Sequence, residues 1–107
     1  MNEEIASLAM NLIFSSGNAK STAIQAIRKA EEDMPEAKKL LKEAQSQLHE
    51  GHAIQTRLMQ DEINGKDVEK SILLIHAQDH FMAADTVILL AKQMMKLYER
   101  LEHNEAV

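Results

Sequence analysis

The sequence contains no cysteine and no tryptophan, only one proline and three glycines, and 3% aromatic residues. Without cysteine, the chain has no disulfide, no thiolate metal site and no thiol nucleophile. A sheet favours Val, Thr and aromatic residues, whereas helix interiors tolerate little Pro or Gly. These absences predict one all-α domain spanning residues 1–107, with a core built from Ala, Leu, Ile and the seven Met.

An excess of basic residues is also absent, because the formal net charge is -5. Proteins that bind nucleic acid usually carry a basic stripe, so a nucleic-acid partner is not expected. The first residues are acidic and lack the basic region of a signal peptide. No apolar run approaches the roughly 18 residues of a membrane span. We therefore expect a soluble, cytoplasmic protein that does not insert into a membrane.

Two breaks divide the chain into three helical segments. The first segment runs from about residue 2 to 32, with a weak point at Gly17, where a helix could kink. Pro35 suits the first turn of a second helix, expected at about 35–63, and Asn64-Gly65 ends it. The third segment starts near residue 67 or 68 and reaches about 103. Such short connections predict an antiparallel three-helix bundle.

The third segment has far more apolar surface than one bundle requires. Its polar residues recur every seven positions and predict one narrow solvent-facing stripe, formed by Ser71, Gln78, Asp85, Lys92 and Glu99. The rest is largely apolar, about twice the face that a helix in a monomeric bundle needs. One account is a homo-oligomer with this helix at its centre, with three-fold symmetry plausible. The other is a long helix that simply exposes some apolar surface.

Asp79 interrupts one of the apolar stripes, which otherwise contains Ile72, Ile75, Met82 and Leu89. An unpaired charge in an apolar seam is costly. If the seam lies on a symmetry axis, one Asp79 from each copy reaches the same point, and the carboxylates repel unless a cation holds them. A hard cation such as Mg²⁺ prefers oxygen ligands. Alternatively, Asp79 is partly exposed or pairs with a Lys of another helix.

The sequence HAQDH, residues 76–80, is the main chemical motif. His76 and His80 are four residues apart and therefore stack on one helix face. The zinc-protease motif also has two histidines at this spacing, but its general base would fall at Ala77. One of the two histidines can instead accept a phosphoryl group while the other histidine and Gln78 donate hydrogen bonds to the phosphoryl oxygens. No Gly-rich nucleotide loop is present, so the donor would be another phosphoprotein.

Three other interpretations stay open at this point. The chain could be a helical adaptor whose third helix joins copies without any chemistry at the histidines. It could be a metal-dependent hydrolase, although Ala77 argues against that reading, or hold structural zinc on His76 and His80. For His49, His52 and His103 we expect solvation or packing rather than chemistry.

The chain resembles the IIA component of the lactose/cellobiose (chitobiose)-type bacterial sugar phosphotransferase system over residues 3–100. The resemblance rests on the segments SSGNAKS at 15–21, GHAIQTRLM at 51–59, Asn64-Gly65, Leu97-Tyr98 and above all LLIHAQDHFM at 73–82. Of these segments, the one containing HAQDH is the specific one.

The resemblance implies a three-helix bundle that assembles as a homotrimer with nine helices. It implies a phosphotransferase component that accepts a phosphoryl group from HPr on His76 and passes it to a cysteine of the IIB component during uptake of a β-linked disaccharide. Gln78 and His80 match the residues flanking the phosphohistidine. Asp79 matches the family's metal-binding aspartate on the trimer axis, which implies one Mg²⁺ per trimer. The sugar itself is not indicated.

Overall fold

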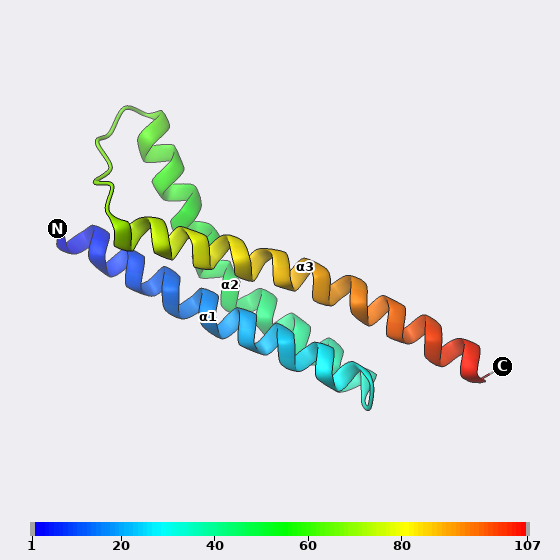
Figure 1. Cartoon of the computed structure of the whole chain (residues 1–107). Coiled ribbons are helices and arrows are strands. Elements are labelled where there is room, and N and C mark those ends of the chain that lie inside the picture. The colour runs from blue at the N-terminus through cyan, green and yellow to red at the C-terminus, as the bar shows by residue number, and fades with distance from the viewer. Residues whose placement is uncertain (1, 107) are drawn as a thin grey trace.

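The computed structural model describes residues 2–106, and side chains as far as residue 104. The described residues form three α-helices, α1 (Glu3–Ala30), α2 (Met34–Ile63) and α3 (Ile72–Ala106). Figure 1 shows α2 running antiparallel to α1 and α3, which are parallel to each other. The bundle is a rod of 60 × 21 × 19 Å. The predicted all-α, three-helix fold is confirmed.

Local signals explain the ends of α1 and α2. The Asn2 side chain accepts a hydrogen bond from the Glu4 backbone N–H, and Asp33 accepts one from the Glu36 N–H, so both helices have an N-cap. Gly65 has a φ of 82°, the left-handed conformation expected after the end of α2. The expected kink at Gly17 is wrong, because α1 continues through it without a break. The continuous buried stripe of α1 outweighs the cost of about 1 kcal/mol for a glycine in a helix.

The start of α3 also differs from the prediction. The helix begins at Ile72, four or five residues later than expected, after an extended link. The Ser71 hydroxyl accepts a hydrogen bond from the Leu74 N–H at 3.1 Å and caps the first turn. The link is tied to the N-terminus, because the Asn2 N–H donates to the Glu69 carboxylate at 2.7 Å. These contacts hold residues 66–70 outside the helix although their polarity pattern resembles its beginning.

Small residues bring the helices close together in the core. Alanines make up most of the buried face of α1 and recur on the buried faces of α2 and α3, and Leu12 and Leu48 are the largest fully buried side chains. Gly51 of α2 faces the Phe81 ring of α3, where an added Cβ would lie 3.1 Å from Phe81 Cδ1. The glycine therefore provides space for an aromatic ring one residue from His80. The core thus extends to Phe81, the residue that directly follows the HAQDH motif.

The polar stripe of α3 was predicted to face solvent, which is confirmed for Lys92 and Glu99, whereas Ser71, Gln78 and Asp85 are half-buried. The Gln78 amide donates to Gln55 of α2, Asp85 lies 3.6 Å from His52, and Glu99 lies 3.4 Å from Lys38. The polar seam formed by these three pairs joins α3 to α2 along most of the rod. The heptad spacing was correct, but a neighbouring polar helix produces the same pattern as water does.

Opposite the core, α3 carries an exposed apolar strip. Its large members are Ile72, Ile75, Met82, Leu89, Leu90, Met94, Leu97 and Leu101, which are 43–86% exposed. By length and composition alone, α3 also passes as a membrane span, with a mean hydropathy of 1.2 and 28% of that window buried. We expected no segment of this kind. The hydropathy of α3 is this high because the helix is apolar on two faces, the buried one and this strip.

Candidate functional site

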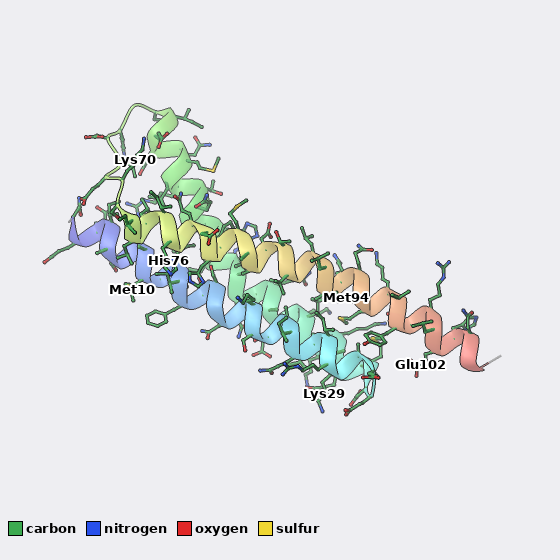
Figure 2. The ribbon with its side chains drawn as sticks, in the orientation of Figure 1. Met10, Lys29, Lys70, His76, Met94 and Glu102 are labelled. Carbon is green, nitrogen blue, oxygen red and sulfur yellow. The ribbon has the colours of Figure 1, made fainter. Side chains whose placement is uncertain are left out.

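His76 and His80 form a contact pair on the surface of α3. Their Nε2 atoms are 3.0 Å apart, and the two rings meet edge to face with centroids 4.4 Å apart. His76 is exposed and His80 is half-buried. The label in Figure 2 places His76 in the first part of α3, on the surface of the rod. The four-residue spacing therefore brings the two imidazoles together as predicted.

The contact between two Nε2 atoms requires one ring to donate and the other to accept. A neutral imidazole carries one N–H and one lone pair, so the donor and acceptor assignment depends on the tautomer. In the arrangement with His80 as donor, His76 Nε2 holds the lone pair that a nucleophile needs. The His80 N–H then lies beside the position of any group that becomes bonded to that nitrogen.

Gln78 lies on a different side of α3 from the histidine pair. It follows His76 by two residues, a rotation of about 200° around the helix. Its Nε2 donates to Gln55 Oε1 of α2 at 3.3 Å, and both side chains are half-buried. Among the hydrogen bonds of the described residues, none joins Gln78 to either histidine. One chain therefore brings His76 and His80 together but not Gln78.

Gln78 also lines a cavity of about 500 Å³ between α2, α3 and the link that joins them. The other lining residues are Leu58, Met59, Glu62, Ile63, Val68, Lys70, Leu74 and Ile75, and neither histidine of the pair is among them. Gln55 is the residue of this region that sequence reasoning missed. The segment GHAIQTRLM contains it, but no periodicity indicates that its amide meets an amide of α3.

Asp79 stands exposed within the apolar strip, between Ile75 and Met82. Among the described side chains, no hydrogen bond or ion pair involves it, so a Lys partner is not observed. One carboxylate per chain is a poor cation site by itself, and within residues 2–104 no three His, Asp or Glu gather at one point. An oxygen donor on an otherwise apolar face does fit a hard cation shared by several copies.

The remaining histidines occupy separate places. His52 of α2 lies edge-on to the Phe81 ring, with centroids 5.0 Å apart, and its Nε2 faces Asp85. His49 and His103 are exposed. The packing expected for these residues is thus found for His52. Its contacts fix α2 against α3 one turn from Gln55.

Comparison with known proteins gives the family. The family model described as the lactose/cellobiose-specific IIA subunit of the PTS system matches residues 7–99. The chain is 40% identical to the lichenan-specific phosphotransferase enzyme IIA component of Bacillus subtilis, over 94% of this chain and 93% of that protein. It is 33% identical to the N,N′-diacetylchitobiose-specific EIIA component of Escherichia coli strain K12, over 94% and 87% of the two chains.

Solved structures agree with this result. The PTS cellobiose-specific enzyme IIA of Bacillus anthracis has a TM-score of 0.89 and 41% identity, over 96% of this chain and 95% of that one. The IIA(chitobiose)–HPr complex of Escherichia coli has a TM-score of 0.76 and 31% identity, over 94% and 99%. The matched relatives and solved structures are components of the sugar phosphotransferase system. The chain belongs to the lactose/cellobiose-specific IIA family of that system.

Proposed function

We propose that this chain carries a phosphoryl group between proteins in the cytoplasm, accepting it from HPr on His76 and passing it to a cysteine of the IIB component during uptake of a β-linked disaccharide. The observation that carries the proposal is the exposed His76–His80 pair with its 3.0 Å contact. A convex helix surface suits a protein donor, which must bring its own phosphohistidine to the acceptor nitrogen. The HPr complex of a structural relative supports HPr as the donor.

The chemistry requires one bond to form as another breaks. The lone pair of His76 Nε2 attacks the phosphorus, and the bond between phosphorus and the donor breaks. The transition state spreads negative charge over three equatorial oxygens. In the resting pair the lone pair of His76 Nε2 accepts the His80 N–H at 3.0 Å, so that hydrogen bond breaks as the attack begins, and the released His80 N–H donates to one of the equatorial oxygens and stabilises the charge as it develops. Transfer to the IIB cysteine is the same exchange, with the thiolate as the attacking group.

We further propose that copies of the chain assemble as a homotrimer through the exposed apolar strip of α3. Around the helix, this strip separates the edge that carries His76 from the edge that carries Gln78. In a ring of copies, each subunit presents one edge to its neighbour and meets the neighbour's other edge. Gln78 of one copy therefore serves the His76 of the next, which reconciles a supporting role for Gln78 with its position.

The same assembly accounts for Asp79. Three Asp79 carboxylates approach each other on the trimer axis, and we propose that one Mg²⁺ binds between them. The ion supplies positive charge that offsets the repulsion of the carboxylates. It supports the assembly and takes no part in phosphoryl transfer.

The decisive experiment is labelling of the purified chain by phosphorylated HPr. We expect label on wild type, none on His76→Ala, and slower labelling of His80→Ala because a donor to the phosphoryl oxygens is lost. His49→Ala is the matched control, since it removes an exposed histidine of α2 and should label as wild type does. Full labelling of His76→Ala would refute His76 as the acceptor, and absence of label on wild type would favour the adaptor reading, in which the histidines carry no chemistry.

A further inference from the structure

The pair of amides between α2 and α3 restricts the orientation of Gln78. A glutamine amide has an oxygen and an NH₂ group of similar shape, and its terminal torsion is broad and roughly two-fold. Rotation by about 180° would exchange the two groups at almost no steric cost. Gln55 limits this freedom, because with its Oε1 as the acceptor only Gln78 Nε2 can form the 3.3 Å bond, and an exchange requires both amides to turn together.

The part of α2 that carries Gln55 is held against α3. One turn earlier on α2, the His52 ring packs edge-on against Phe81 and its Nε2 lies 3.6 Å from Asp85. Gln55 is half-buried, so its amide has fewer alternative partners in water than an exposed one. Gln55 therefore extends from a backbone position held beside α3, and its amide oxygen is the acceptor that Gln78 meets.

The orientation of the Gln78 amide determines whether it stabilises or repels an anion. A phosphoryl group is stabilised by N–H donors and repelled by a carbonyl oxygen. With one N–H on Gln55, the amide of Gln78 keeps its second N–H for another acceptor. An amide without the Gln55 contact would rotate freely and present its carbonyl oxygen to the anion as often as an N–H.

We propose that Gln55 is a positioning residue for phosphoryl transfer, which acts by holding the Gln78 amide in the orientation that offers an N–H to the phosphoryl group. The inference rests on the proposed function, because it requires a phosphohistidine at the site. Gln55 does not touch the reacting atoms and acts only through Gln78. Its removal must therefore have no effect once Gln78 is absent.

A double-mutant cycle tests this dependence. The variants are Gln55→Leu, Gln78→Leu and the two together in the full-length chain, with kcat and KM measured for transfer from phosphorylated HPr. Gln55→Leu keeps the approximate size and removes the acceptor, and Gln55→Glu keeps an acceptor oxygen. Gln45→Leu, an exposed glutamine of the same helix, is the matched control. Thermal melting identifies any variant that fails to fold.

We expect Gln55→Leu to lower kcat about 3- to 10-fold with little change in KM, as for the loss of one hydrogen bond. The double variant should be no slower than Gln78→Leu, and Gln55→Glu should be faster than Gln55→Leu. In wild type, the hydrogen-bonded proton of the Gln78 side-chain NH₂ should be shifted downfield in the NMR spectrum, and in Gln55→Leu both NH₂ protons should move to the values of an exposed glutamine.

Multiplicative losses in the double variant would overturn the inference, as would a Gln55→Leu variant that transfers like Gln45→Leu or an unchanged NH₂ spectrum. A purely structural role for Gln55 would lower the melting temperature and leave kcat unchanged, which also overturns it. Failure of the proposed function has a different signature, because wild type itself would then remain unlabelled or His76→Ala would retain label. The NMR comparison still decides the amide orientation in that event.

Discussion

Leu89→Asp should dissociate the proposed trimer. Leu89 is 58% exposed in the single chain, and complete burial of a leucine side chain contributes about 1.5–3 kcal/mol. Covering the exposed part at an interface therefore recovers about 1–2 kcal/mol per copy. The aspartate loses this contribution and adds a desolvation cost of several kcal/mol for a buried ion. A total of about 3 kcal/mol or more per copy weakens association on the order of 100-fold or more.

Sedimentation of wild type and variant over a range of concentrations measures the effect. We expect trimers for wild type and mostly monomers for Leu89→Asp at micromolar concentration, with helical content retained because the mutated position faces away from the core. Gln45→Asp is the control for placing an aspartate in an exposed helix position, and it should sediment as wild type does. Equal trimer content in wild type and Leu89→Asp would refute the assignment of the strip as the interface.

Three further predictions follow from other contacts. Asp79→Leu should keep or strengthen association, by up to about 4 kcal/mol, because an apolar group can replace a buried charge without net cost. The variant should also lose the Mg²⁺ binding that calorimetry measures for wild type. A monomeric variant would contradict the axial position of Asp79. Gly51→Ala should unfold at lower temperature and Gly17→Ala at higher temperature, because the new methyl group meets Phe81 at 3.1 Å in the first and nothing within 4 Å in the second. In Gly51→Ala, overpacking costs about 1–3 kcal/mol of stability, whereas the better helix propensity of alanine adds about 1 kcal/mol. A Gly51→Ala variant more stable than wild type would show that the Phe81 ring moves aside. Subunits carrying His76→Ala and Gln78→Leu, each impaired alone, should regain fast labelling when co-expressed, because a mixed ring contains a wild-type His76 beside a wild-type Gln78; no gain over the separate variants would place both residues in the same subunit's site.

The sequence predicted what local chemistry determines. Pro35 and Gly65 marked the limits of α2 correctly, because their backbone preferences act without help from the rest of the fold. The start of α3 was missed although Ser71 is a recognisable capping residue, since the apolar pattern continues into the preceding link. The predicted break at Gly17 is wrong, because a buried stripe on both sides of the glycine keeps α1 continuous.

The histidine pair could be predicted because both members lie on one helix at a fixed spacing. Gln55 could not, because its contact with Gln78 spans 23 residues and depends on how α2 lies against α3. The error about the polar stripe has the same origin. A polar residue every seventh position indicates a polar surrounding, but one sequence does not say whether water or a neighbouring helix provides it.

In the proposed trimer, the arrangement of α3 gives a reason why the proposed carrier needs more than one copy. A histidine that receives a phosphoryl group from a protein must be exposed, yet a transition state with spread negative charge requires donors around it. Within one chain, His76 has His80 as a neighbour, and the Gln78 amide lies about 200° away around the helix. In the proposed trimer, burying the apolar strip against another copy brings the Gln78 amide of that copy to the histidine and leaves the side that a donor approaches uncovered. Association and catalysis therefore depend on the same surface, so a variant that only dissociates the copies should also slow phosphoryl transfer.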